Sequence, residues 1–487
     1  MSFYLNSCLL FCFILFFCSY KGKAQALELE DVLKISLENS SLAVQLQKNV
    51  LIKDLEYSKI LFSSRPTLSL QLSGPSYTHT LSPVEQPDGT IDYKSINRTN
   101  YSTTANLSYP LLFSGGSLSV SSSLSSYMNL GSNGYNNYSF NYYSAAISQP
   151  LNFFSSTKWE RIVGKWEDQI KGINLCMNYV DIKKTAAELY FKLLKTNIQI
   201  KNTEEKINYL QEYLKIVEQL YQKEKISRID YIEFKLMVSG LKNSLNDTEN
   251  LYQISKSELT TFLKVEDLII DTNEIPFLVT IFFDESIAFL CLNKIQSIKE
   301  ECLYYSNKQR EKYFKAQKGL NSTLNISFGL NSSGMDWEYI GQQKQVSESF
   351  SFSINIPILD WGYRRADFLI SQLTNTKKFE EFEYSSAKEI IDLESLFFQL
   401  KENEKSYYNL VSHIELLKEK NEILFNKMQH GAISIKELRD NEYEILDSEY
   451  KLITLIEKSW ECYFNIEKMT LYDFISDNPI ADYLRDF

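Results

Sequence analysis

The sequence is poor in the residues that build catalytic and metal sites. Its 487 residues include only three histidines, His79, His413 and His430, and none has a partner at metal-ligand spacing. The chain contains no G-x-S-x-G motif, no P-loop and no Rossmann fingerprint. These absences argue against an enzyme, and we expect no cofactor and no bound metal.

Clustered positive charge is also lacking. The 51 Lys and Arg are outnumbered by 62 Asp and Glu, which gives a net charge of −11 spread along the chain. Affinity for nucleic acid depends on clustered Lys and Arg, so we expect no nucleic-acid partner. Aromatic residues are abundant instead, with 32 Tyr and 30 Phe. At this level they either pack a core or girdle a membrane barrel.

Long hydrophobic runs are limited to one. "CLLFCFILFFC" at Cys8–Cys18 is too short to span a bilayer and is typical of a secretory signal. "KAQA" at Lys23–Ala26 offers small residues for cleavage, so residues 1–25 are predicted to be a signal peptide. No other apolar run reaches transmembrane length. Any membrane contact is therefore expected through strands or an amphipathic surface.

The remaining cysteines do not form a disulfide framework. They are few and scattered, so we expect small buried apolar side chains rather than crosslinks. These cysteines are Cys176, Cys291, Cys302 and Cys462.

Proline is missing from two long stretches, between Pro150 and Pro276 and between Pro357 and Pro479. Proline is expelled from helix interiors, so both stretches permit very long helices. Apolar residues within them follow the 3-4 spacing of a coiled-coil seam. A helix over residues 157–223 would extend roughly 100 Å, which predicts a rod. The seams are Ile207, Leu210, Leu214, Val217 and Tyr221, and Leu410, Ile414, Leu417, Asn421, Leu424 and Met428.

Segments rich in Ser, Thr, Asn and Gly alternate apolar and polar residues. A period of two predicts strands with two different faces. Such strands suit a barrel with a water-filled lumen and an apolar exterior that faces lipid. They suit equally a soluble sandwich with its polar face outward. The segments are Thr67–Ser73, Ser102–Pro110, Ser117–Tyr127, Tyr142–Pro150, Thr323–Leu330 and Ser347–Ile358.

The chain repeats itself after 207 residues. "ISQPL" aligns with "INIPI", so that Pro150 matches Pro357, and "EKISRIDYIE" aligns with "GAISIKELRD", so that Glu224 matches Gly431. Both pairs of landmarks give the same offset, 357 − 150 and 431 − 224. We therefore predict a duplicated unit made of a helix, strands, a long helix and a second helix.

The two predicted repeats follow directly after the signal peptide. The first repeat, residues 26–283, carries strands at about 66–151 and a helical hairpin at about 157–263. The second repeat, residues 284–487, carries strands at about 323–358 and a helical hairpin at about 363–470.

Each long helix is predicted to end at a reversal of the chain. Gly431 can take a positive φ at a helix C-terminus. Ser434 then caps the next helix, with Glu437 as its capping-box partner. In the first repeat Ser227 occupies the cap and Asp230 the third position, without a glycine before them. The chain must therefore make this first turn without a glycine.

These features resemble the TolC-type outer-membrane efflux channel family. The resemblance rests on the duplication, on the "QPL"-like strand end before each long helix, and on a G-x-x-S-x-x-D/E-L reversal. "GAISIKEL" fits this reversal and "EKISRIDY" lacks its glycine. The resemblance covers essentially the whole mature chain. It implies a mainly α fold with membrane strands, in which a homotrimer shares one outer-membrane β-barrel and forms an α-helical periplasmic tunnel.

The resemblance also implies a function. The chain would be the exit duct of a tripartite efflux or type I secretion system, working with a periplasmic adaptor (membrane fusion) protein, an inner-membrane transporter and outer-membrane lipid. The alternative is a surface structural or adhesive protein with a coiled-coil stalk and a β head. The duplicated order favours the channel, because a stalk needs no repeated return of the chain to the membrane.

Site residues follow from the resemblance by position. It places Asp230, Glu437 and Asp440 at the periplasmic entrance, where three copies of each would form acidic rings that favour cations. Asp230 and Glu437 are also helix N-terminal acids, which stabilise caps and the helix dipole. The hairpin-turn residues, where the adaptor would dock, are Ile226, Ser227, Gly431, Ile433 and Ser434.

Two features depart from the family pattern. The family commonly closes the entrance with an arginine two residues after the second glycine, and Ile433 stands there in this chain. The first β region also holds an additional hairpin around Leu111–Ser126, with Gly115 and Gly116 as its turn. This hairpin either widens the strand count, forms an external loop or packs below the membrane.

Overall fold

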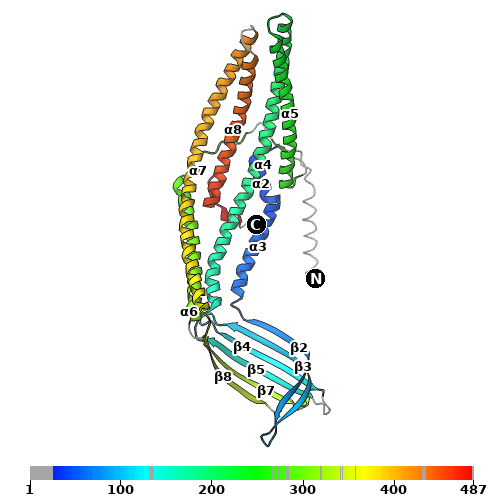
Figure 1. Ribbon diagram of the computed structural model, residues 1–487, viewed down its shortest axis with the longest axis vertical. Coiled ribbons are helices and arrows are strands. Elements are labelled where there is room, and N and C mark those ends of the chain that lie inside the picture. The colour runs from blue at the N-terminus through cyan, green and yellow to red at the C-terminus, as the bar shows by residue number, and fades with distance from the viewer. Residues whose placement is uncertain are drawn as a thin grey trace, which may run out of the picture. The chain divides into compact units, whose positions relative to one another are not determined.

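Helices, one six-stranded antiparallel sheet and two two-stranded sheets make up the described part of the computed structural model of this protein (Figure 1). It describes residues 26–130, 136–265, 268–270, 275–280, 284–318, 321–339, 342, 344–356, 358–429 and 435–484. The predicted signal peptide therefore lies outside the described residues. No described helix combines the length and the apolar character needed to cross a bilayer.

The helices repeat in length and in spacing. Helices α4 (Ser156–Gln222) and α7 (Tyr363–Gln429) both have 67 residues. Helices α5 (Arg228–Leu263) and α8 (Ile435–Thr470) both have 36 residues. The starts of α4 and α7 and the starts of α5 and α8 are 207 residues apart, 363 − 156 and 435 − 228, which is the offset found in the sequence.

Other helices precede the strands of each half. Helices α2 (Leu29–Asn39) and α3 (Ser41–Phe62) come before the first strands, and α6 (Glu285–Lys318) comes before the second set. The short elements are β1 (Ala26–Leu27), which pairs in parallel with β6 (Ile269–Ile270), the antiparallel pair β9 (Tyr472–Asp473) and β10 (Asn478–Pro479), η1 (Trp337–Tyr339) and α9 (Ile480–Tyr483).

The chain forms two compact units, and both repeats contribute to each. The helical unit takes the described residues up to Val50, Gly172–Ile295 and the described residues from Ser386 onward. The sheet unit takes Leu51–Lys171 and Gln296–Ser385. The compact units therefore cut across the two proposed repeats.

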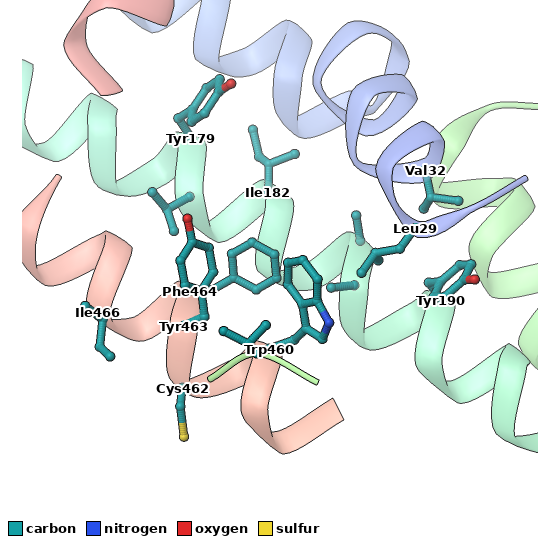
Figure 2. Close-up of a cluster of buried hydrophobic side chains, with 14 of the residues drawn as sticks. Leu29, Val32, Tyr179, Ile182, Tyr190, Trp460, Cys462, Tyr463, Phe464 and Ile466 are labelled. Carbon is teal, nitrogen blue, oxygen red and sulfur yellow. The ribbon is translucent and has the colours of Figure 1, made fainter. Parts of the chain in front are cut away.

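The core of the helical unit is aromatic and lies between α2, α4 and α8. Trp460, Tyr463 and Phe464 follow one another on α8, and the Trp460 ring lies 5.7 Å from the Phe464 ring. Tyr190 and Phe191 of α4 are also almost fully buried. Figure 2 shows Trp460, Tyr463 and Phe464 of α8 beside α4, with Leu29 and Val32 of α2 in the same cluster. This packing holds α2 and the end of α8 against α4.

Six antiparallel strands form the sheet, in the order β2-β3-β4-β5-β7-β8, with β2 and β8 at its two edges (Figure 1). The alternating segments predicted as strands fall on these six, except that the last was predicted to reach Ile358 and β8 ends at Asn355. The pairing of β5 with β7 joins the two halves of the chain. The strands are β2 (Thr67–Glu85), β3 (Ile91–Pro110), β4 (Ser117–Asn129), β5 (Asn136–Pro150), β7 (Asn321–Gly334) and β8 (Gln345–Asn355).

The register gives the sheet one apolar and one polar face. Side chains alternate between faces along a strand, and directly paired residues share a face. One row of the apolar face reads Tyr109, Leu118, Ile147, Ile326 and Phe350 across five strands. The neighbouring row of the polar face reads Ser108, Ser119, Ala146, Ser327 and Ser349.

The additional hairpin is an integral part of this sheet. Strand β3 pairs with β2 and β4 pairs with β5, so the hairpin widens the sheet instead of forming a separate loop. The chain reverses between Pro110 and Ser117, and Leu111 N donates to Gly116 O at 2.8 Å. Gly115 has a φ of 74°, and a Cβ on it would lie 2.1 Å from the Phe154 carbonyl oxygen. The predicted glycine turn is therefore confirmed, because only glycine fits there.

Candidate functional site

The first helix reversal turns without a glycine. Glu224, two residues after the end of α4, takes a left-handed backbone with a φ of 52°. Its N–H donates to Tyr221 O at 2.9 Å, and Lys225 N donates to Leu220 O at 2.9 Å. These two bonds form a Schellman motif, which satisfies carbonyls left free at a helix end. The route that the sequence left open is therefore a glutamate in the glycine position.

A capping box begins the next helix. Asp230 N donates to Ser227 Oγ at 3.1 Å, and Ser227 N donates to the Asp230 carboxylate at 3.3 Å. Two backbone donors of the first turn of α5 are thus satisfied reciprocally. Ser227 Oγ also donates to Asp230 at 2.7 Å. The capping role predicted for Ser227 and Asp230 is confirmed, whereas their roles at an entrance stay predictions.

The second reversal is described only from its later side. Gly431, Ile433 and Ser434 lie outside the described residues, so the second predicted cap stays a prediction. Glu437 is exposed in the first turn of α8, where a negative charge favours the helix dipole. Asp440 accepts from the guanidinium of Arg439 at 3.1 Å.

The predicted acidic residues belong to separate helices. Asp230 is on α5, and Glu437 and Asp440 are on α8. Among the described residues, no hydrogen bond or ion pair joins Asp230 to either of the other two. Ile226, predicted to line the docking surface, packs partly buried against an apolar cluster that we call the hairpin cluster. Its buried residues are Ile207, Leu210, Val217, Phe234, Met237, Val238, Leu241, Leu424, Phe425 and Leu438.

Phe425 connects the two helical hairpins within the hairpin cluster. Its ring lies 4.0 Å from the Tyr213 ring and 4.7 Å from the Tyr209 ring, both on α4. Since Phe425 is on α7, the first and second hairpins pack against each other at this point. Aromatic pairs at such distances add roughly 0.5–1.5 kcal/mol beyond their buried area.

A buried polar network connects the same hairpins. Lys206 of α4 donates to Glu442 O at 3.1 Å and pairs with the Glu442 carboxylate at 3.0 Å. Asn441 Nδ2 donates to Asn421 Oδ1 at 3.1 Å, and Asn421 in turn donates to Glu442. Glu442 is 4% exposed and Asn441 is 1% exposed. This inter-hairpin network therefore fixes how α4, α7 and α8 align, because buried polar groups require their partners.

Sequence reasoning missed most of the inter-hairpin network. Asn421 carried a signal, because it is an amide inside an otherwise apolar seam. Lys206 and Glu442 carried none, since charged residues between seam positions usually face water. Among the described residues, no group of three or more His, Cys, Asp or Glu has the arrangement of a metal site.

Comparison with known proteins identifies the fold. No protein-family model matches the chain, and no curated protein matches it in sequence. The outer-membrane channel OprN superposes with a TM-score of 0.66 at 13% identity, over 91% of this chain and 89% of OprN. The Campylobacter jejuni CmeC outer membrane channel gives 0.64 at 12% identity, over 94% of this chain and 88% of CmeC.

A third solved structure agrees with these two. The outer membrane protein VceC from Vibrio cholerae gives a TM-score of 0.64 at 10% identity, over 91% of this chain and 95% of VceC. The likeness spans helices and sheet together, since it covers nearly the whole of each chain. The chain therefore has the fold of the TolC-type outer-membrane channels, as its duplicated reversals and strand ends indicated.

Proposed function

We propose that this protein is an outer-membrane channel that extends into the periplasm and conducts its cargo passively. The observation that carries the proposal is the two-faced sheet. Its apolar face exposes large side chains, with Leu68, Leu70 and Phe350 at 77%, 67% and 72% exposure. An apolar face of this extent is costly in water and stable against lipid. The opposite face, rich in serine, suits a water-filled lumen.

Assembly into a homotrimer is supported by apolar stripes on two helices. On α7, four exposed residues fall on one side of the helix when successive residues are placed 100° apart. The opposite side of α7 already packs in the core through Leu393, Phe397 and Leu400. The exposed stripe consists of Ile391, Phe398, Leu416 and Ile423, which are between 48% and 69% exposed.

Helix α5 carries a second exposed stripe, on the other hairpin. It consists of Ile229, Ile232, Leu236, Leu251 and Ile254, which are between 45% and 70% exposed. In our proposal α5 of one copy packs against α7 of the next copy. Two different surfaces that pair head to tail generate a closed ring if the rotation closes. Three copies in such a ring would enclose the tunnel.

The proposed partners follow from this arrangement. The helix reversals would lie at the periplasmic end, where Ile226, Ser227, Gly431, Ile433 and Ser434 would contact the adaptor. An inner-membrane transporter would supply the energy, in either an efflux or a type I secretion system. The fold shared with OprN and CmeC supports the channel role.

The test is the conductance of the purified protein. Detergent extraction of the outer membrane should yield an integral trimer that forms ion-conducting channels in planar bilayers. A soluble β sandwich on a stalk would be released without detergent and would conduct nothing. Either of these results would overturn the proposal.

The acidic entrance is tested by neutralising its charges. The variant Asp230→Asn, Glu437→Gln and Asp440→Asn removes three charges per copy, while asparagine can still accept the capping bond at position 230. We expect its preference for K⁺ over Cl⁻, measured as the reversal potential in a KCl gradient, to fall about twofold or more.

The control for this variant is Glu38→Gln, which removes an exposed charge on α2. It should leave the reversal potential unchanged. Unaltered selectivity in the triple variant would remove these three residues from the conduction path, whereas the channel proposal would stand.

A further inference from the structure

The additional hairpin raises the strand count of each copy to six, with an antiparallel partner for every strand except at the two edges. We propose that the β3–β4 hairpin forms part of the barrel wall, and that β8 of one copy pairs with β2 of the next. Six strands from each of three copies then close an 18-stranded barrel. This inference rests on the proposed channel function.

The apolar face supports a place for β4 in the wall. Leu118 and Val120 of β4 pair with Ile147 and Ala145 of β5, so the apolar rows run through the hairpin without interruption. No residue of β4 from Ser117 to Met128 is buried on either face. A hairpin packed outside or below a barrel would cover one of its faces. Both faces of β4 are instead open, as in a wall with lipid on one side and water on the other.

The polar face continues in the same way. Ser119, Ser121 and Ser123 of β4 pair with Ala146, Ser144 and Asn141 of β5. On the other side of β4, Ser121 pairs with Asn106 of β3. Small polar side chains therefore line one face over all six strands, which is the pattern of a water-filled lumen. The hairpin shares the two-faced character of the strands beside it.

The edges of the sheet show why a second copy is the partner. Every residue of β8 is exposed, including Phe350 and Phe352, and no strand of the described residues lies beside the outer edge of β2. Unpaired backbone groups cannot remain in lipid, so an open sheet must close. Because neighbouring strands alternate in direction and their number is even, β8 and β2 run antiparallel. The same kind of ladder can therefore continue from one copy to the next.

The number of strands determines the diameter of the barrel. With strands about 4.8 Å apart and tilted by about 40°, 18 strands give a backbone diameter of about 36 Å. Without the β3–β4 hairpin, 12 strands would give only about 24 Å by the same geometry. Barrels of 16–18 strands leave an aqueous channel. We therefore infer that the membrane part of this duct admits bulky cargo.

Single cysteines test the place of β4. Native Cys176, Cys291, Cys302 and Cys462 are first replaced by serine, and conductance shows that this background is intact. Ser121→Cys and Val120→Cys then probe the two faces of β4 in liposomes. We expect a membrane-impermeant maleimide to label Ser121→Cys, and brominated lipid to quench a bimane on Val120→Cys.

Strand β7 provides the matched control. Ser327→Cys should label with the maleimide, and a bimane on Ile326→Cys should be quenched by brominated lipid. If β7 alternates in this way and β4 does not, the hairpin lies outside the wall and only this inference fails. If β7 does not alternate either, the channel proposal fails as well.

Disulfide crosslinking tests the closing pair. Ser69→Cys on β2 is combined in turn with cysteine at Ser347, Ser349, Ser351 or Ser353 on β8. One register should give covalent trimers on a non-reducing gel. Ser327→Cys with Ser349→Cys is the control, since these hydroxyls lie 2.7 Å apart within one copy. If the control pair crosslinks and no β2–β8 pair does, the edges do not meet and the 18-stranded barrel is wrong.

Discussion

At the scale of single residues, a buried charged cluster ties the C-terminal segment to α4. Lys183 Nζ lies 2.6 Å from Glu467 Oε1 and 3.4 Å from Asp473 Oδ2. The Tyr463 hydroxyl donates to Asp473 at 2.7 Å. Two carboxylates thus share one lysine, so the fully ionised cluster carries a net negative charge away from water. Such a cluster takes up a proton more readily than exposed carboxylates do.

Glu467 is the group that takes up this proton. Burial raises its pKa to about 7, although Lys183 opposes the shift. Burial also acts to raise the pKa of Asp473, but Lys183 and the Tyr463 hydrogen bond outweigh it and lower the pKa. Burial acts to lower the pKa of Lys183, and the two carboxylates outweigh it and raise that pKa. Between about pH 4.5 and 7 the folded protein therefore binds more protons at Glu467 than the unfolded chain does.

We predict that stability falls as the pH rises through this window. The pKa difference at Glu467 corresponds to about 3 kcal/mol of folding free energy, lost between about pH 4.5 and 7. Glu467→Gln should remove this part of the pH dependence, because the amide does not ionise. The measurement is the unfolding temperature in detergent at pH 5 and at pH 8.

The control for this prediction is Glu461→Gln, whose carboxylate is 48% exposed and pairs with Lys184. It should leave the pH dependence as it is. Equal slopes for the wild-type protein and Glu467→Gln would show that Glu467 stays ionised in the fold.

At the scale of elements, an apolar cluster and a buried polar network join the two helical hairpins. The hairpin cluster buries apolar side chains, and the Phe425 ring packs against Tyr209 and Tyr213 of α4. The inter-hairpin network favours this alignment, because Lys206 and Asn421 both reach the buried Glu442 carboxylate in it. A polar residue in an apolar seam sets the register of helices in this way.

Lys206→Met should destabilise the contact between the hairpins. The substitution leaves the Glu442 carboxylate buried without its cation, and the loss of one partner from a buried pair costs about 3–5 kcal/mol. Hydrogen exchange of the α8 amides, measured by mass spectrometry, should increase around Glu442.

The exposed ion pair Lys192–Glu258 offers a matched control. It joins α4 to α5 with side-chain exposures of 49% and 42%. Lys192→Met should change stability by less than about 1 kcal/mol, because exposed pairs contribute little. Similar effects of both substitutions would mean that the inter-hairpin network does not hold the hairpins together.

At the scale of the whole molecule, one copy leaves apolar surface uncovered, and three such surfaces take part in the proposed assembly. These are the apolar face of the sheet and the exposed stripes of α5 and α7. Lipid would cover the first and neighbouring copies would cover the other two. A single copy therefore leaves these apolar side chains exposed to water. Assembly in a membrane would bury them.

Phe398→Ser should weaken assembly without unfolding the copy. Phe398 is 69% exposed, and burial of such a side chain contributes roughly 1.5–3 kcal/mol per interface. The helical circular dichroism should be unchanged. Light scattering in detergent should show that the variant trimer dissociates at a higher protein concentration than the wild-type trimer does.

Tyr408→Ser is the matched control. Tyr408 is 60% exposed on the same helix and lies off the α7 stripe. Trimers should persist in this variant. Loss of trimers in both variants, or in neither, would contradict the pairing of α5 with α7.

The sequence by itself determined the elements of this protein and their order. The proline-free stretches and the seam through Ile207 and Leu214 predicted the long helices, and the alternation of small polar and apolar residues predicted the strands. Ser227 and Asp230 predicted the capping box. These features depend on residues close together in the chain, and such spacing is visible without a structure.

Only the tertiary structure decided which distant residues meet. It placed the β3–β4 hairpin inside the sheet, joined the halves through β5 and β7, and brought Lys206 to Glu442 and Lys183 to Glu467. Local periodicity does not encode such pairs, because they depend on which surfaces pack after the helices and strands have formed.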